Sequence, residues 1–334
     1  MEPASMTKMV NAIEAWRSLR RTKVHFVVGL CGMDAKVIYL WRPMNRPLLT
    51  WIIFVALVLV WGSSFILMKH ALIGFTAIQI GAARILFATV FTLSFAFPQL
   101  KEFRKADLAP LLLVAILGNS IPYVLFPIAV AHVPSGVVGI TNSMTPLFTL
   151  LVGLIAFGRP LKRLRAFGVA VGFIGAVILI NPFDDHSSVG QNWPYLLLAV
   201  LAAACYGVSI NTIGDRLKHL SPRAITLFAM LGASVPSMGI LAGSHVTDQL
   251  TGSPEMWSSL AAIAFLGMVG TSLAMVVFNR LIAMTTPLFA ASTTYVIPIV
   301  ALGWGLIFGE DLLINHYLGM VTILVGVWMV NKKT

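Results

Sequence analysis

Ten apolar segments, each long enough to cross or nearly cross a lipid bilayer, restrict this chain to one broad class of fold. The hydrocarbon core of a bilayer needs about 20 apolar residues of α-helix, and helices satisfy their own backbone hydrogen bonds there. Only 10% of the residues are charged, whereas a soluble domain carries about 25%. The sequence therefore predicts an all-α integral membrane protein. Its ten expected transmembrane helices cover residues 48–70, 76–97, 109–131, 134–157, 166–181, 194–213, 224–243, 257–281, 286–308 and 315–330.

The connections between these segments are short, which argues against a soluble catalytic domain. Within the segments there is no cluster of His, Asp, Glu and Cys residues. The two cysteines, Cys31 and Cys205, are far apart and lack the spacing of metal ligands. We therefore expect no enzymatic activity, no metal site and no cofactor.

The two halves of the chain echo each other at an offset of 152 residues. Pro146 and Pro298 lie at that offset, and both fall in the middle of long apolar segments. The other matching pairs are Gly118 and Gly270, Ser120 and Ser272, Val124 and Val276, Phe126 and Phe278, Ala131 and Ala283, and Thr141 and Thr293. This pattern predicts two five-helix repeats, residues 48–181 and 182–334. Because five is an odd number of spans, the repeats are expected to be inverted relative to each other.

The basic residues gather on one side of the predicted membrane, which fixes the expected orientation. The formal net charge is +11, and 21 of the 23 Lys and Arg residues fall in the N-terminal segment, alternate loops and the C-terminal end. The opposite loops have none, but they carry six acidic residues. This asymmetry predicts a multi-pass protein of the cell (inner) membrane with both termini in the cytoplasm. It also explains the net charge without a nucleic-acid partner.

Residues 1–47 precede the first span and are expected to form a cytoplasmic extension. Two interpretations are open. Val10, Ile13, Trp16 and Leu19 recur every three residues beside arginines, which is typical of an amphipathic helix on the membrane surface. Alternatively, this stretch is upstream sequence included by a misassigned start, because Met44 is followed directly by a basic residue and the first span. We favour the second interpretation, with a true start near Met44.

Several short motifs occur in order along the chain. They are Trp61-Gly62-Ser63-Ser64-Phe65, Lys69, Arg84, Pro298, Gly309-Glu310-Asp311-Leu312, Gly319 and Gly326. Over about residues 48–331 the chain resembles the EamA-type family of the drug/metabolite transporter superfamily. The resemblance implies ten helices in two inverted repeats and, in many members, export of amino acids or related metabolites. One departure is Gly158-Arg159, where members often have Gly-Glu, so Glu310 has no counterpart in the first half.

The two matching prolines point to a candidate site near the middle of the membrane. Pro146 cannot donate to the carbonyl of Asn142, and Pro298 cannot donate to that of Thr294. An unpaired carbonyl at this depth must face protein or a cavity. We expect Pro146 and Pro298 to be hinges and Asn142, Thr145 and Thr294 to contact a solute. The alternative is that these side chains only satisfy the opened backbone and pack one helix on another.

Further candidate contacts combine aromatic and polar side chains at helical spacing. Trp61 and Ser64 are three residues apart, and Tyr206 and Ser209 repeat that spacing in the sixth segment. Asn119 and Tyr123 are four apart and share an expected helix face. An aromatic cavity with a few polar groups suits amino acids or flat metabolites, whereas the alternative is ordinary packing. The predicted solute contacts are Trp61, Ser64, Arg84, Asn119, Tyr123, Asn142, Thr145, Tyr206, Ser209, Thr294 and Tyr295.

Lys69 and Arg84 are the two basic residues outside the inner segments. Lys69 ends the first helix, where its long stem either snorkels to the surface or takes part in gating or charge pairing with Glu310. Arg84 lies well inside the second span and requires a partner. A structural partner would be helix-terminal carbonyls, and a functional partner would be a solute carboxylate or Glu310. We favour the structural partner.

No acidic residue lies deep in a predicted span, which argues against proton-coupled export of cationic drugs. The sequence therefore favours a secondary exporter of small metabolites, namely amino acids or related zwitterionic or anionic solutes. We expect alternating access around a midplane cavity, with the lipid bilayer and the solute as partners and a monomer or homodimer as the assembly. Uptake of a nucleoside- or vitamin-like metabolite is one alternative. A non-transporting membrane scaffold is another.

Overall fold

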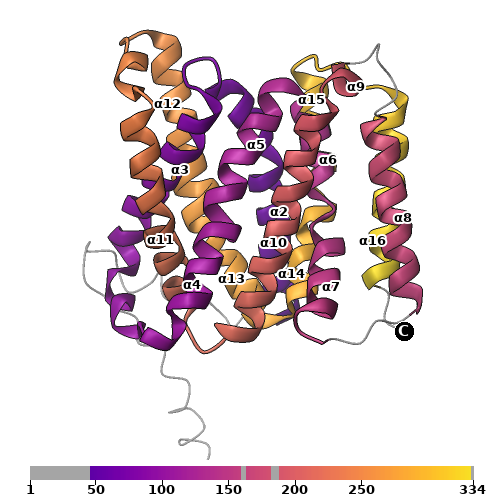
Figure 1. The fold of residues 1–334 in the computed structure, drawn as a ribbon, viewed down its shortest axis with the longest axis horizontal. Helices are drawn as coiled ribbons and strands as arrows, with labels where there is room; N and C mark the ends of the chain where they lie inside the picture. The colour runs from indigo at the N-terminus through magenta and orange to yellow at the C-terminus, as the bar shows by residue number, and fades with distance from the viewer. Residues whose placement is uncertain (1–45, 159–162, 182–187, 332–334) are drawn as a thin grey trace, which may run out of the picture. The chain divides into compact units, whose positions relative to one another are not determined.

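The computed structural model describes residues 46–158, 163–181 and 188–331. These residues form helices and turns, and no β-strand occurs among them. The main helices are α2 (Arg46–Ala71), α3 (Ala77–Ala96), α4 (Leu108–Ala115), α5 (Ile121–His132), α6 (Ser135–Asn142), α7 (Thr145–Ile155), α8 (Arg163–Ile180), α10 (Trp193–Arg216), α11 (Pro222–Gly243), α12 (Pro254–Gly267), α13 (Ala274–Met284), α14 (Pro287–Ala291), α15 (Ile297–Ile307) and α16 (Ile314–Asn331). Figure 1 shows these helices running alongside one another.

Nine helical stretches in the described ranges are long and apolar enough to cross a membrane. They are Leu48–Ala71, Ala77–Glu102, Lys105–His132, Ser135–Ile155, Arg163–Ile180, Trp193–Arg216, Pro222–Gly243, Pro254–Met284 and Pro287–Ile307. A tenth apolar helix, Ile314–Val330, is shorter. The sequence predicts short fifth and tenth segments. In the structure the fifth helix, α8, has 18 residues, and the tenth, α16, also has 18, of which Ile314–Val330 is the apolar part.

Two of these stretches contain a π-helical turn at matching places. The turn Ile116–Ser120 lies between α4 and α5, and the turn Met268–Leu273 lies between α12 and α13. They begin 152 residues apart, which is the offset of the sequence repeat. A π turn takes its carbonyls out of the regular i→i+4 ladder and frees them for other donors.

Two further stretches are interrupted rather than continuous. α6 ends at Asn142 and α7 begins at Thr145. In the second half, α14 is followed by the 3₁₀ turn Ser292–Tyr295 before α15 begins. Pro146 and Pro298 each occupy the first turn of the helix after the break, where a missing N–H is tolerated.

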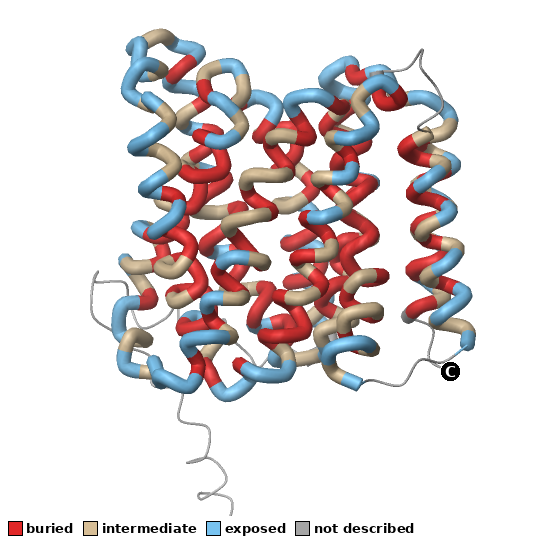
Figure 2. Tube along the Cα trace, in the orientation of Figure 1, coloured by how far each residue is buried: buried red, intermediate tan, exposed pale blue. Residues whose placement is uncertain are grey.

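The apolar core follows the centre of this helical unit, as the buried positions in Figure 2 show. One buried cluster joins α5, α6 and α10 with parts of α2 and α15. A second joins α2, α10, α11 and α13. Burial on both sides of α2 and α10 holds these two helices in place, so that side chains between the clusters are positioned by rigid elements.

Helices α8 and α16 pair at one edge of this unit (Figure 1) through glycines. A Cβ atom on Gly326 would meet backbone atoms of Gly168 and Gly172. A Cβ on Gly175 would come within 2.6 Å of the backbone nitrogen of Ile323. Small residues let the two backbones approach in the manner of membrane helix pairs.

Some of the sequence predictions fall outside the described residues. These are the amphipathic helix or misassigned start in residues 1–45, the Arg159 that replaces the expected Glu, and the C-terminal residues 332–334.

Candidate functional site

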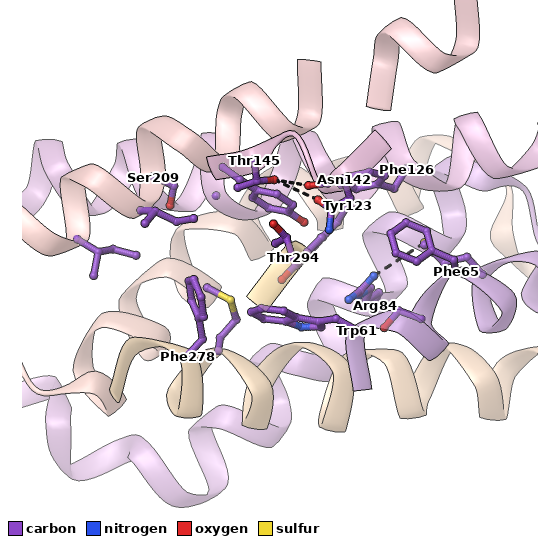
Figure 3. Close-up of a pocket in the computed structure, with 17 residues that line it drawn as sticks. Trp61, Phe65, Arg84, Tyr123, Phe126, Asn142, Thr145, Ser209, Phe278 and Thr294 are labelled. Atoms are coloured by element: carbon purple, nitrogen blue, oxygen red, sulfur yellow. Dashed lines mark hydrogen bonds between the residues drawn. The ribbon is translucent and has the colours of Figure 1, made fainter. Parts of the chain in front are cut away.

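A cavity lies between the two core clusters. The lining comes from α2, α3, the first π turn, α5, the break between α6 and α7, α10, α13 and the 3₁₀ turn before α15. The residues are Trp61, Ser64, Phe65, Met68, Arg84, Gly118, Tyr123, Phe126, Asn142, Thr145, Tyr206, Ser209, Ile210, Ile213, Met275, Phe278 and Thr294. Figure 3 shows them converging on the same space.

Aromatic rings form much of the wall. Trp61 and Phe278 meet edge to face with ring centroids 5.0 Å apart, and both lie on the same side of the cavity in Figure 3. The indole N–H of Trp61 donates to the carbonyl of Gly270 in the second π turn at 3.0 Å, which fixes the ring. Phe126 and Tyr206 stack at 5.9 Å. Such rings suit a solute with an apolar or flat body.

Arg84 is buried, with 4% of its surface exposed, although it carries a charge. Its Nε donates to the hydroxyl of Thr271 at 2.7 Å, and Nη2 donates to the carbonyl of Gly270 at 3.4 Å. Nη1 lies 3.9 Å from the sulfur of Met68. The guanidinium carbon sits 4.3 Å from the centre of the Tyr123 ring, within cation–π range.

The Arg84 guanidinium has no carboxylate partner among the described residues. One of its acceptors is a backbone carbonyl inside the span, in the π turn Met268–Leu273, rather than a helix-terminal carbonyl. It also lines the cavity, which keeps the functional interpretation open. The π turn Met268–Leu273 supplies both oxygen acceptors and thereby orients Arg84.

The broken helices bring Asn142, Thr145 and Thr294 to the cavity, and Figure 3 shows Asn142 and Thr145 across from Trp61 and Phe278. The Thr145 hydroxyl donates to the backbone carbonyl of Asn142 at 2.8 Å, so the carbonyl freed by Pro146 is already paired. The Thr294 hydroxyl likewise donates to a backbone carbonyl, at 2.8 Å. These threonines satisfy backbone and line the cavity at once, which leaves their oxygens as acceptors.

The two serine–aromatic pairs predicted from spacing also reach the cavity. Trp61 and Ser64 enter it from α2, and Tyr206 and Ser209 enter it from α10. The Ser64 hydroxyl donates to the carbonyl of Val60 at 2.9 Å. A Cβ on Gly118 would collide with the Ser209 hydroxyl, so a glycine is needed where α10 crosses the first π turn.

Glu310 ties three helices together at the end of the bundle that the charge pattern predicts to face outward. Its Oε1 lies 2.8 Å from Nζ of Lys69 in α2. The same carboxylate accepts the N–H groups of Ser135 and Gly136 at 2.9 Å each and the Ser135 hydroxyl at 2.7 Å, at the start of α6. Lys69 is therefore paired with Glu310, and Glu310 is not the partner of Arg84.

Burial and hydrogen bonding act in opposite directions on the pKa of Glu310. Burial raises this pKa, whereas hydrogen bonds from Lys69, Gly136 and Ser135 lower it and prevail. The net pKa lies below its ordinary value of 4.5, so the group is a carboxylate at neutral pH. An anion at a helix N-terminus is also favoured by the helix dipole.

Two contacts join neighbouring loops at the opposite end of the bundle. Glu102 accepts the N–H and the hydroxyl of Ser221, both at 2.9 Å, at the start of α11. Nε2 of His219 lies 3.1 Å from Oδ2 of Asp107. Both ends of the described helical unit therefore carry a carboxylate that caps a distant helix.

Two predicted solute contacts do not line this cavity. Asn119 is fully buried, and its Nδ2 donates to the carbonyl of Val114 at 2.9 Å, next to the first π turn. Tyr295 closes the 3₁₀ turn before α15 and packs against the first core cluster. Their contact with a solute stays a prediction.

Several lining residues are not among the predicted solute contacts, although the sequence carries signals for them. Gly118, Phe126 and Phe278 belong to pairs matched at the repeat offset, and all three line the cavity. Phe65 and Met68 continue the helix face of Trp61 and Ser64 at helical spacing. Within the described ranges no three His, Cys, Asp or Glu side chains gather closely enough to hold a metal ion. The absence of a metal or cofactor stays a prediction.

The family model of the EamA-like transporter family matches this chain over residues 49–181 and 193–332. The chain belongs to the EamA-like transporter family. It is thus a membrane transporter by family, with a small-molecule solute and a lipid bilayer as its partners.

Relatives of this EamA-like transporter are similar over most of their length. It is 29% identical over 287 residues to the inner membrane transporter YedA of Escherichia coli, covering 82% of this chain and 88% of YedA. It is 24% identical to a probable amino-acid metabolite efflux pump of Salmonella typhimurium, covering 81% and 91% of the two chains. It is 21% identical to a probable terminal-alkyne amino-acid exporter of Streptantibioticus cattleyicolor, covering 83% and 91%.

One solved crystal structure shares the fold with a TM-score of 0.61. The alignment covers 86% of this chain and 97% of the other at 14% sequence identity. The helical arrangement is therefore one that an experimentally determined protein also adopts.

Proposed function

We propose that this protein is a secondary exporter of small metabolites, namely amino acids or related zwitterionic or anionic solutes. It works by alternating access around the cavity between the two core clusters. The observation that carries this proposal is the buried guanidinium of Arg84, which lines an aromatic cavity and has no carboxylate partner among the described residues. A solute carboxylate would supply that partner.

The proposed architecture is ten transmembrane helices in two inverted five-helix repeats. One family model matches two successive stretches of the chain, which supports the duplication. The π turns Ile116–Ser120 and Met268–Leu273 begin at the repeat offset, and a helix break follows each of them. Interrupted helices at corresponding places in two halves are typical of transporter binding sites.

Export across the inner membrane, with both termini cytoplasmic, is the proposed direction and orientation. The one-sided distribution of basic residues supports the orientation. Two of the similar proteins are described as a probable efflux pump and a probable exporter of amino-acid compounds, which supports the direction and the class of solute. The contacts of Glu310 with Lys69 and of Glu102 with Ser221 lie at opposite ends and would act as gates.

The protein is proposed to have no enzymatic activity. Uptake of a nucleoside- or vitamin-like metabolite is the rival within transport, and a non-transporting scaffold is the rival outside it. The cavity supports a transporter over a scaffold, because a scaffold has no need of an enclosed charge against aromatic walls.

The test is transport by purified protein in proteoliposomes loaded with a panel of amino acids and related metabolites. We expect efflux of at least one panel member above protein-free vesicles. Metabolite profiles of cells that lack or overproduce the protein identify the solute in parallel. Accumulation inside the overproducing cells would favour uptake. A protein that moves nothing from the panel and co-purifies with a fixed partner would favour the scaffold.

A further inference from the structure

The cavity contains one charged group and lacks an opposite charge. Arg84 is the single ionised side chain among its lining residues in the described ranges. The other polar lining groups are neutral hydroxyls and amides. An ion at this depth is costly unless it is paired, so an anion bound in the cavity would supply the missing charge partner of Arg84.

The described acidic residues are committed elsewhere or lie near helix ends. Glu310 pairs with Lys69, Asp107 with His219, and Glu102 with Ser221. The remaining ones, Asp215, Asp248, Glu255 and Asp311, fall in or near the connections between spans. No carboxylate in the described part of the chain is thus available to hold Arg84 or to bind the ammonium of an amino acid inside the cavity.

The Arg84 guanidinium has N–H donors that are not bonded to an oxygen acceptor. It carries five N–H donors, of which Nε and one N–H of Nη2 reach oxygen acceptors. Nη1 faces only the thioether of Met68, at 3.9 Å. A carboxylate bound to the Nη1 and Nη2 side would make charge-assisted bonds without displacing the Thr271 contact.

We infer that the preferred solute is an organic monoanion, a carboxylate on an apolar or aromatic body, and that its export is electrogenic. This inference rests on the proposed function and deepens it. Arg84 takes the carboxylate, and Trp61, Phe278 and Phe126 enclose the body. An amino group on the solute is dispensable, because the cavity offers it only neutral acceptors.

This charge assignment also supplies a driving force. A cell interior that is negative by 100 mV favours the outward movement of one negative charge by about 2.3 kcal/mol. At about 1.4 kcal/mol per tenfold, that energy sustains a solute gradient of about 50-fold. Net transfer of a monoanion therefore needs no buried acid to carry a proton, whereas a zwitterion gains nothing from the potential.

The first test is a binding series on the wild-type protein. 3-Phenylpropionate, L-phenylalanine and 2-phenylethylamine share an apolar body and differ in their charged groups. We expect 3-phenylpropionate to stabilise the purified protein against heat at least as strongly as phenylalanine, with binding at least tenfold tighter than that of the amine. An amine that binds as tightly as the acid would overturn the inference, and this result does not depend on the folding of any variant.

The second test is efflux of labelled 3-phenylpropionate from proteoliposomes with a potassium gradient and valinomycin. An inside-negative potential of about 100 mV should shift the equilibrium distribution outward by about 50-fold.

Arg84→Gln should abolish binding and efflux, whereas Arg223→Gln, which removes an exposed charge at the start of α11, should leave both unchanged. Efflux that does not depend on the membrane potential would overturn the inference but leave the exporter proposal intact. Arg84-dependent binding without any efflux would overturn the exporter proposal instead.

Discussion

The Nζ atom of Lys69 lies 2.8 Å from Oε1 of Glu310, although 241 residues separate the two in the chain. The Lys69 side chain is 44% exposed, whereas that of Glu310 is 1% exposed and also caps α6 through Ser135 and Gly136. Glu310→Gln keeps the shape but replaces one of the two accepting oxygens with an NH₂ group, which faces a donor and cannot accept its hydrogen bond. We expect it to lower the free energy of unfolding by about 1–3 kcal/mol, measured on purified protein in detergent.

Lys69→Met is the matched comparison for that variant. It removes the half-exposed member of the pair and leaves Glu310 its bonds to α6. Water screens the half-exposed Lys69, and the bonds to α6 still hold the Glu310 carboxylate, so we expect a smaller loss of about 1 kcal/mol. Equal losses in the two variants would contradict the view that Glu310 acts mainly by capping α6.

Protonation of Glu310 is expected to weaken the same contacts. Its pKa is lowered from 4.5 in the folded protein, so its stabilising effect is complete above the unfolded pKa and is lost as the pH falls through the folded pKa. The stability difference between wild type and Glu310→Gln should therefore stay constant from neutral pH to about 5 and shrink only below that. Thermal midpoints of both proteins across this range give the result. A difference that already shrinks between about pH 7 and 6 would argue against the lowered pKa.

Where residues follow a local helical periodicity, the sequence alone predicts which of them approach the cavity. Trp61 and Ser64, and likewise Tyr206 and Ser209, follow regular α-helical spacing and line the same cavity. The same rule predicts that Asn119 and Tyr123 share a helix face, but helical spacing does not hold between these two residues. The π turn Ile116–Ser120 inserts extra backbone between them, so Gly118, five residues before Tyr123, takes the lining position.

Local sequence patterns do not predict contacts between residues that are far apart in the chain. The acceptor of Arg84 Nε is Thr271, 187 residues away, and nothing around either residue indicates the contact. The contact between Lys69 and Glu310 is predictable, because the charge pattern places both residues at the same end of the bundle. The second π turn has no proline to mark it. Its repeat offset from the first was the only signal in the sequence.

Substitutions at two neighbouring residues of the second π turn distinguish an effect on the orientation of Arg84 from an effect on general packing. Thr271 accepts from Arg84, whereas the Ser272 hydroxyl lies 2.6 Å from that of Thr92. Thr271→Val removes the acceptor at nearly constant volume, so we expect weaker solute binding, about tenfold for one charge-assisted bond. Ser272→Ala should lower stability by about 1 kcal/mol with unchanged affinity. Isothermal titration and thermal unfolding of both variants check this, and equal affinities would show that Thr271 does not position Arg84.

The glycine contact between α8 and α16 gives a prediction that is independent of the solute. A Cβ on Gly326 would overlap the backbone of Gly168 and Gly172, so Gly326→Ala must push the two helices apart. We expect a loss of about 1–3 kcal/mol, as for other overpacked sites. Gly303→Ala in α15 is the matched control, because a Cβ there meets no atom within 4 Å. It should be neutral or slightly stabilising, since alanine favours a helix over glycine by about 1 kcal/mol. Unfolding of both variants in bicelles measures the contrast, and a Gly326→Ala protein as stable as Gly303→Ala would show that α8 and α16 do not pack this closely.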